Sequence, residues 1–256
     1  MGSEDVIDPK YRKAGKLDPK QFATSFHLSA FRILDNVEQI LLPNFEKADR
    51  RPIPLRKLKA QLYKLNVYSG PSGLFKKHVD TPRFDTQIGS LVVCFPSPFQ
   101  GGILIVRHQG KEVDIDWSQK SKTTIQWAAF YSNYQNYHRR ERITLTYNFY
   151  VTTPIGGSIP PKSIVNPKSL SLHGFLRSIF MDPKFIRIGG VLGIYCSHSY
   201  PHTSPEVKRL LPNTLKVADL KLYSVLKDLG VHVEISPVMD SESRYFILSM
   251  RMTVII

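Results

Sequence analysis

The spacing of apolar residues changes twice along this chain. Near the N-terminus, residues 33–45 place Ile33, Val37 and Ile40 near one helical face, and Pro43 follows. Apolar side chains three or four positions apart share one face of a helix, and proline cannot continue a helix. This stretch therefore predicts an amphipathic helix that ends at Pro43.

Between residues 58 and 150 the pattern becomes that of short strands. Apolar and polar residues alternate over residues 60–68, which predicts a strand with Tyr63, Leu65 and Val67 on its apolar face. Runs rich in β-branched and aromatic residues follow at residues 89–95, 101–108, 123–131 and 142–151. Five or more short strands separated by turns are typical of a β-sandwich or barrel.

After residue 151 prolines and glycines mark a connector, and helical and strand patterns follow. The clearest helix is predicted over residues 213–229, because Leu215, Leu222 and Val225 recur at helical spacing before Gly230. We thus expect a mainly β fold with flanking helices, of the α+β class. Three segments are predicted: N-terminal helical support at 1–57, the β core at 58–150 and a C-terminal α/β extension at 151–256, packed on the core.

Composition and charge narrow the classes of partner. The chain is 42% hydrophobic and 22% charged, which is typical of globular proteins. It has no apolar run of 18 residues and no apolar N-terminal segment, so we expect neither a membrane span nor a signal peptide. An intracellular protein, cytoplasmic or nuclear, is the default, with Cys94 and Cys196 as buried free thiols.

The net charge of +14 is spread over separate segments, the densest running from Arg50 to Lys64. Dispersed charge favours a solvated basic surface over a nucleic-acid groove, which is possible but not favoured. The sequence does not indicate an oligomeric state. His198 and His202 lie four positions apart, but Pro201 between them excludes a helical metal pair. For these two residues, hydrogen bonding in the core or in a loop is predicted.

One motif carries candidate metal chemistry. His78 and Asp80 lie two positions apart, and residues with this spacing on an extended chain point to the same side. An imidazole and a carboxylate can then bind one ion. With a second, distant histidine they would form the facial triad that binds Fe(II) and leaves positions open for oxygen chemistry. Taken alone, such a pair is more often a surface pair than a metal site.

The segments around this motif resemble the prolyl-4-hydroxylase-like branch of the Fe(II)- and 2-oxoglutarate-dependent dioxygenases, in particular a group of fungal proteins. Tyr68, a glycine-rich turn, Phe75 and the His78–Asp80 pair resemble the strand and loop that open the metal site. The closing strand of the family is matched by RITLTYNFY, which begins at Arg142. Segments 88–117, 125–134, 189–204 and 211–230 also look like parts of that group, in the same order.

The resemblance implies a double-stranded β-helix core, of the jelly-roll or cupin-like kind. It also implies Fe(II) as cofactor, 2-oxoglutarate and O2 as cosubstrates, and oxidation, typically hydroxylation, of a substrate that the sequence does not identify. His78 and Asp80 would be the catalytic metal ligands. Arg142 would bind the distal carboxylate of 2-oxoglutarate, a role suited to a planar guanidinium. Tyr68 would donate a hydrogen bond near the same carboxylate.

The pattern departs from the family at the second metal histidine, where this chain has Asn136. One alternative is that His138 supplies the missing metal ligand. It shares a strand face with position 136 and would lie opposite Arg142 across a short hairpin loop. Otherwise the ligand is lost, because an amide oxygen holds Fe(II) less well than imidazole. Two rival functions stay open: a non-catalytic binding or structural protein on the same fold and, more weakly, a basic nucleic-acid-binding module.

Overall fold

A computed structural model describes residues 14–46, 55–68, 74–78, 86–99, 103–108, 111–131, 134–137, 142–153, 164–200, 209–239 and 247–255. The fold is mainly β with few helices, as the sequence pattern predicts. The chain forms two compact units. The first unit comprises Met1–His27, Ala60–Pro82 and Gln87–Tyr150, and the second comprises Leu28–Lys59, Arg83–Thr86 and Val151–Ile256. The three-segment division of the chain stays a prediction.

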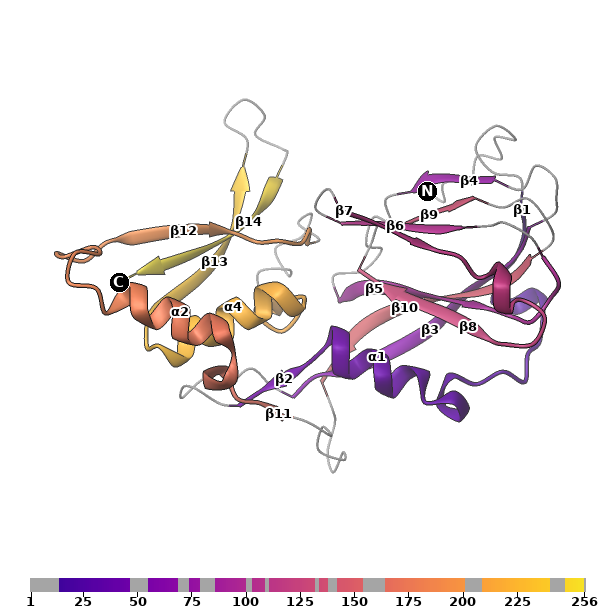
Figure 1. Cartoon of the computed structure of the whole chain (residues 1–256), viewed down its shortest axis with the longest axis horizontal. Helices are drawn as coiled ribbons and strands as arrows, with labels where there is room; N and C mark the ends of the chain where they lie inside the picture. Colours follow the sequence, from indigo (N-terminus) through magenta and orange to yellow (C-terminus); the bar gives the residue numbers. More distant parts are fainter. Residues whose placement is uncertain are drawn as a thin grey trace. The chain divides into compact units, whose positions relative to one another are not determined.

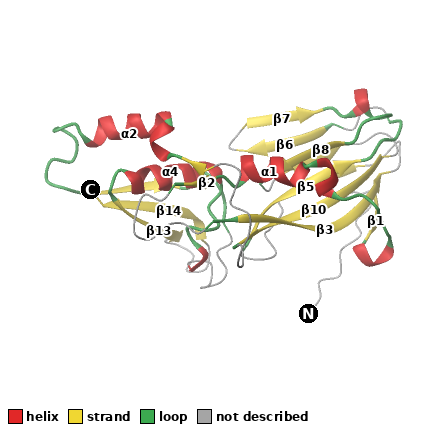
Figure 2. Ribbon diagram, turned by 90° about the horizontal axis from the view of Figure 1, so that it is seen from below, coloured by secondary structure: helices red, strands yellow, loops and turns green. Residues whose placement is uncertain are grey.

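Two β-sheets make up the body of the first unit (Figures 1 and 2). In sheet order, the five-stranded sheet contains β1 (Ala14–Leu17), β3 (Lys57–Tyr68), β10 (Arg142–Thr152), β5 (Gln87–Cys94) and β8 (Gln126–Phe130). The four-stranded sheet contains β4 (Leu74–His78), β9 (Tyr134–Tyr137), β6 (Leu104–His108) and β7 (Lys111–Ile115). Short 3-10 helices flank the sheets at Pro19–Gln21 and Ser118–Lys120.

From β3 to β10 the chain passes back and forth between the two sheets. β3, β5, β8 and β10 belong to the five-stranded sheet, whereas β4, β6, β7 and β9 belong to the four-stranded sheet. Consecutive strands therefore lie in opposite sheets, except for the β6–β7 hairpin. Neighbours within a sheet are consequently distant in sequence, as Thr144 opposite Cys94 illustrates.

Side chains from both sheets pack together in the core of the first unit. The buried cluster consists of Val92, Cys94, Phe99, Leu104, Trp117, Ala128 and Phe130. Val106 of β6 and Ile115 of β7 pack against this cluster. Because β5 and β8 contribute from one sheet and β6 and β7 from the other, the core lies between the two sheets.

The face of β3 that is buried more deeply is the polar one. The buried residues are Lys64, Asn66 and Tyr68, and the half-buried residues are Tyr63, Leu65 and Val67. The Asn66 amide donates a hydrogen bond of 3.1 Å to the Thr146 hydroxyl of β10. Buried polar groups are tolerated where they find such partners. The alternation therefore located the strand and the face that Tyr63, Leu65 and Val67 share, and the structure shows that this face is half-buried.

Gly89 lies where β5 approaches β8, and we expect Gly89→Ala to destabilise the first unit. A Cβ at this position would lie 2.4 Å from the Phe130 carbonyl oxygen, which is part of the backbone. Relieving this overlap requires the strands to separate, so the free energy of unfolding should fall by about 3 kcal/mol, as in overpacked cores. Urea unfolding measures the loss. Gly15→Ala is the control, because its Cβ would meet Val67 at an ordinary 3.7 Å. Equal midpoints for the two variants would contradict the prediction.

The second unit contains a three-stranded antiparallel sheet with two helices, α2 and α4, against one face (Figure 1). Its helices are α1 (Ile33–Leu41), α2 (Ser171–Phe180) and α4 (Val217–Asp228), with 3-10 turns at Leu28–Phe31 and Pro167–Ser169. Its sheet has the order β12 (Val191–Tyr195), β14 (Ile247–Ile255), β13 (His232–Met239), and β2 (Asn44–Phe45) pairs in parallel with β11 (Ile164–Val165). Leu220 and Leu226 of α4 are buried with Met252 and Val254 of β14.

Two predicted helices are confirmed, with corrections at their faces and ends. Helix α1 buries Ile33 and Val37, but Ile40 is 65% exposed, so the buried stripe is narrower than predicted. Helix α4 begins at Val217, later than predicted. Gly230 follows it with a φ of 79°, the left-handed conformation in which glycine commonly ends helices. Within the described residues, no helix is long and apolar enough to cross a membrane.

Arg56 corrects the expectation that the basic stretch from Arg50 to Lys64 is solvated. Both Arg56 and Lys64 are buried. The Arg56 guanidinium donates hydrogen bonds of 3.0 Å to the Asn213 and Leu215 carbonyls and one of 2.7 Å to the Pro43 carbonyl. This cation therefore ties the chain before β3 to the turn that precedes α4, and it contributes nothing to a basic surface.

Candidate functional site

The interior of the first unit is polar along β3 and β10. The buried polar residues of β10 on this face are Arg142, Thr144, Thr146 and Asn148. Thr144 and Thr146 lie opposite Cys94 and Val92 of β5, both of which belong to the core cluster. Directly paired residues of antiparallel strands share a face, so this polar row lines the space between the two sheets.

Among the described residues of the first unit, Arg142 is the most deeply buried cation, with an exposed fraction of 0%. Its guanidinium carbon lies 4.4 Å from the centroid of the Trp117 ring and 5.7 Å from that of Phe99. A cation over an indole face is stabilised by the ring quadrupole, the more so away from water. The Gln126 amide donates a hydrogen bond of 2.7 Å to the Trp117 carbonyl and so helps to fix this residue.

The electrostatics of this interior depend on burial. Burial lowers the pKa of Arg142, while the nearby Cys94 and Tyr68 act in the opposite direction. Arginine nevertheless stays charged in proteins. Burial also raises the pKa of the Cys94 thiol, against the opposing effect of Arg142, so Cys94 is a neutral thiol at neutral pH. The interior thus holds a fixed positive charge beside a thiol and the buried Tyr68.

The predicted metal ligands map to β4, β9 and the segments that follow them. His78 is the last residue of β4 and pairs with Tyr134 of β9. Asn136 of β9 lies opposite Phe75 of β4 and Leu104 of β6. The backbones of positions 78 and 136 are therefore on neighbouring strands.

Asp80 and His138 lie outside the described residues, and so do the side chains of His78 and Asn136. Among the side chains that the structure describes, no three His, Cys, Asp or Glu residues gather to hold a metal ion. Of the predicted cosubstrate residues, the structure describes both Arg142 and Tyr68 and brings them close enough to interact electrostatically. The metal ligand assignment stays a prediction.

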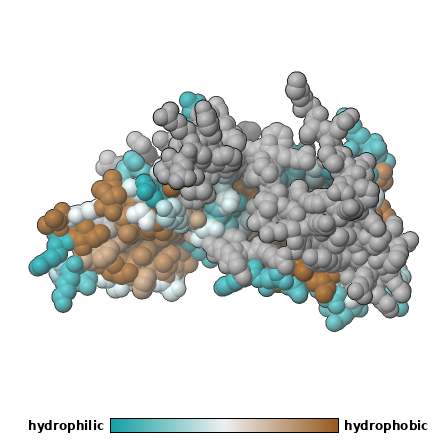
Figure 3. Space-filling model, turned by 90° about the horizontal axis from the view of Figure 1, so that it is seen from above, coloured by the Kyte–Doolittle hydropathy of each residue, from teal (hydrophilic) through white to brown (hydrophobic). Residues whose placement is uncertain are grey.

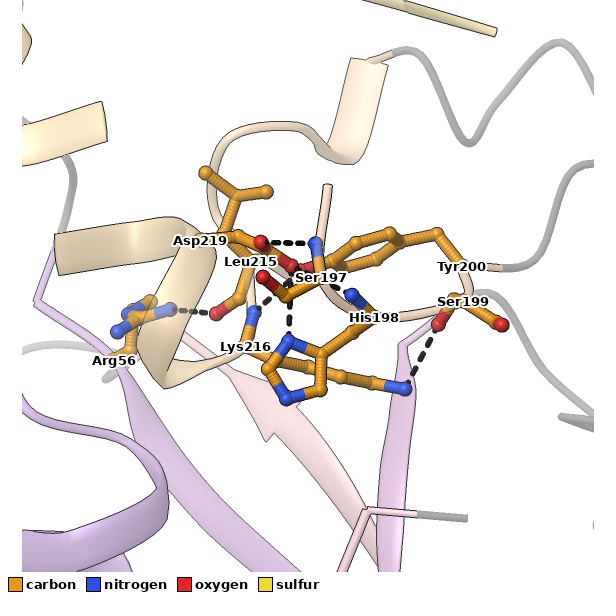
Figure 4. Close-up of polar contacts among 8 residues, drawn as sticks. All are labelled: Arg56, Ser197, His198, Ser199, Tyr200, Leu215, Lys216 and Asp219. Carbon is orange, nitrogen blue, oxygen red and sulfur yellow. Dashed lines mark hydrogen bonds and ion pairs between the residues drawn. The ribbon is translucent and has the colours of Figure 1, made fainter. Parts of the chain in front are cut away.

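A second polar cluster lies in the second unit and centres on the buried Asp219 of α4 (Figure 4). One carboxylate oxygen accepts a hydrogen bond of 2.6 Å from the Ser197 N–H. The other lies 2.9 Å from His198 Nδ1 and accepts hydrogen bonds from the His198 N–H and the Tyr200 hydroxyl. The Tyr200 oxygen in turn accepts from the Lys216 N–H. The cluster joins the segment after β12 to the first turn of α4.

Burial and hydrogen bonds compete in this cluster. Burial alone would raise the pKa of Asp219, but hydrogen bonds from His198, Tyr200 and the Ser197 N–H outweigh it and lower the pKa. Burial lowers the pKa of Lys216 to about 8, although Asp219 opposes this. The sequence predicted only that His198 would be hydrogen-bonded, which is confirmed. It gave no signal for Asp219, because its partners lie about twenty residues earlier in an irregular segment.

No known family model matches this chain, and no curated protein does. Among solved structures, it is similar to a 2OG-Fe(II) oxygenase family oxidoreductase from Burkholderia pseudomallei, with 18% identity, a TM-score of 0.30 and coverage of 36% of this chain and 45% of that chain. A prolyl-4-hydroxylase from Pseudomonas putida shows 18% identity, a TM-score of 0.36 and coverage of 56% and 72%. A Trichoplax adhaerens prolyl hydroxylase, solved with a hypoxia inducible factor peptide fragment, shows 18% identity, a TM-score of 0.27 and coverage of 39% and 46%. The chain thus spans less than half the length of the first and third of these proteins.

Proposed function

We propose that the first unit is a double-stranded β-helix that binds 2-oxoglutarate and Fe(II) and oxidises a substrate in the manner of the dioxygenases that the sequence resembles. The observation that carries the proposal is the Arg142 guanidinium, buried between the sheets at the start of the last strand. Placing a cation in the protein interior is costly, and an anionic ligand offsets that cost. A guanidinium presents paired donors that match a carboxylate.

The path of the chain supports the proposed fold. Eight strands, β3 to β10, are divided equally between two facing sheets, and consecutive strands lie in opposite sheets except for β6 and β7. A double sheet of eight strands in this order is the jelly-roll arrangement of cupins. Arg142 begins the eighth strand, which is where the resemblance puts the residue that binds the cosubstrate.

The register of the four-stranded sheet supports a metal site on its inner face. Leu104 belongs to the core cluster and pairs with Asn136, so position 136 belongs to the core-facing side of the sheet. Val106 packs on the same cluster and pairs with Tyr134, which pairs with His78. This backbone register supports the proposal that positions 78 and 136 belong to one face of the four-stranded sheet.

The donor set fits Fe(II) in part. An imidazole and a carboxylate, from His78 and Asp80, are ligands that Fe(II) accepts, and a third donor would come from His138 or, more weakly, from Asn136. When bound, the metal would supply oxygen activation and oxidation of a substrate C–H bond. The chain's own residues would do the rest: Arg142 binds the distal carboxylate, Trp117 holds the guanidinium plane, and Tyr68 donates a hydrogen bond nearby. The apolar cluster around them excludes water.

Asn136 at the expected ligand position favours one alternative, a non-catalytic protein that binds a carboxylate ligand on the same fold. Such a protein would keep the Arg142 site and lose the metal. Both functions predict ligand binding, and they differ in whether a metal ion contributes to it.

Thermal unfolding with Mn(II), as a redox-stable substitute for Fe(II), and 2-oxoglutarate tests the proposal. We expect 2-oxoglutarate to raise the Tm, and to raise it further when Mn(II) is present, because a ligand at 100 times its Kd stabilises the native state by about 2.7 kcal/mol. His78→Ala should remove only the metal-dependent part. His138→Ala should do the same if His138 is the third ligand, whereas Asn136→His should strengthen metal binding if that ligand was lost.

A shift with 2-oxoglutarate that Mn(II) leaves unchanged would favour the non-catalytic alternative. No shift with either ligand would contradict the proposal. Turnover of 2-oxoglutarate to succinate by the wild-type protein, and its loss in His78→Ala, would establish the enzyme.

A further inference from the structure

The two edges of the sheet in the second unit differ in their protection against pairing with another strand. The β13 edge carries Pro237, a register shift after Val238 and a 3.3 Å contact between His232 and Glu234. Proline, bulges and charges are the usual means by which proteins protect an exposed sheet edge. The β12 edge, Val191–Tyr195, reads VLGIY and has neither a charge nor a proline.

The backbone of β12 presents unused hydrogen-bonding groups at this edge. The Cys196 N–H donates a hydrogen bond of 2.8 Å to the Met250 carbonyl of β14. Hydrogen-bonded positions alternate along an antiparallel pair, so the backbone groups of Leu192 and Ile194 also point toward β14. The N–H and C=O groups of Val191, Gly193 and Tyr195 therefore point away from β14. Among the described strands, β12 pairs with β14 alone and forms an edge of its sheet.

Apolar side chains are exposed beside this edge. Val191 is 68% exposed and Tyr195 is 63% exposed, while the preceding turn presents Ile188 at 99%. Figure 3 shows hydrophobic side chains gathered on this side of the second unit. On the opposite face of β12, Leu192 and Ile194 pack against the core yet remain half-buried. An added strand with apolar side chains on the helix-facing side would complete their burial.

The charge at this edge is positive. Arg251 of β14 lies opposite Tyr195, and its side chain passes over Gly193, where a Cβ would be 3.0 Å from the arginine Cδ. Arg251 is exposed and forms no ion pair with any carboxylate in the described part of the chain. The whole chain carries a net charge of +14, so a second copy would be repelled and an acidic segment attracted.

From these four features we propose that β12 binds an extended peptide segment of a partner protein by strand addition. The segment would place apolar residues on the side facing α2 and α4 and acidic residues on the side of Arg251. Backbone hydrogen bonds to Val191, Gly193 and Tyr195 would supply affinity, and the alternating side chains would supply selectivity. This docking strand is independent of the proposed oxygenase site.

Binding of a fluorescein-labelled peptide, Glu-Val-Glu-Val-Glu-Val-Glu, to the full chain tests the proposal by fluorescence anisotropy. Val191→Pro removes an outward N–H while leaving the ladder to β14 intact, so we expect binding at least about tenfold weaker. The matched control is Val191→Thr, which keeps the N–H and a β-branched side chain and should bind like wild type. Arg251→Gln should weaken binding and reduce its dependence on salt.

Four results would overturn the proposal. They are no binding by wild type, equal binding by Val191→Pro, equal binding of a peptide with Lys in place of Glu, and a wild-type dimer in sedimentation that Val191→Pro dissociates. The last result would mean that a second copy of the chain occupies the edge. Circular dichroism of each variant establishes that the second unit remains folded.

Discussion

Arg142→Met is expected to weaken 2-oxoglutarate binding by about 100-fold or more while the first unit stays folded. The guanidinium is fully buried, and removing one partner of a desolvated charge pair costs about 2–5 kcal/mol of binding free energy. Methionine fills a similar length without a charge. Because replacing a buried cation by an apolar side chain is often neutral or stabilising, the free energy of unfolding without ligand should not fall.

Calorimetric titration of 2-oxoglutarate in the presence of Mn(II) measures the affinity, and urea unfolding measures the stability. Arg142→Lys is the control, because it keeps the charge but loses the paired donors and the planar contact with Trp117. Its affinity should fall between those of wild type and Arg142→Met. Unchanged 2-oxoglutarate affinity in a folded Arg142→Met protein would exclude the assigned role of Arg142, whatever the metal does.

Trp117 explains how a buried cation can be held ready for a ligand. The centroid of its ring lies 4.4 Å from the guanidinium carbon, and that of the Phe99 ring lies 5.7 Å from it. These rings stabilise the charge without neutralising it. A guanidinium held in this way keeps the paired donors and the positive charge that suit a carboxylate ligand.

The sequence predicted the elements of the fold but not which face of a strand is buried. Alternation with a period of two identified β3 correctly, because the period follows from strand geometry alone. Which face of β3 is buried depends on β10, some eighty residues later, where Thr146 accepts a hydrogen bond from Asn66. Local pattern contains no information about that partner. Arg56 illustrates the same limit, since a count of charges cannot distinguish a solvated arginine from a buried one that binds three backbone carbonyls.

The candidate site was likewise predicted unevenly. Arg142 was assigned from the resemblance of one strand, and the structure buries it completely. The metal ligands rest on the spacing of His78 and Asp80, and their arrangement stays a prediction. Asp219 was not predicted at all, because a helical aspartate ordinarily faces solvent. Only the fold brings the irregular segment around His198 to the first turn of α4.

Asp219→Asn is expected to lower the free energy of unfolding of the second unit by about 3–5 kcal/mol, the usual cost of breaking a buried charged network. The carboxylate accepts hydrogen bonds from the Ser197 and His198 N–H groups and from the Tyr200 hydroxyl. An amide can accept at one atom only and would present its NH2 group to these donors. The buried Lys216 would also lose the nearby negative charge that favours its protonated form.

Acid should reproduce part of this effect in the wild-type protein. The pKa of Asp219 is lowered in the fold, so its contribution to stability is complete above the unfolded value of about 3.9 and is lost as the pH falls through the lowered pKa. Amide hydrogen exchange of residues 196–200 and of α4 measures the local free energy of unfolding.

Glu234→Gln is the control for Asp219→Asn. The exposed Glu234 carboxylate pairs only with His232 among the described residues, so this substitution should change the free energy of unfolding by about 0.5 kcal/mol at most. If Asp219→Asn and Glu234→Gln exchange alike, the cluster adds no net stability, and its hydrogen bonds merely replace those that the same groups make to water in the unfolded chain.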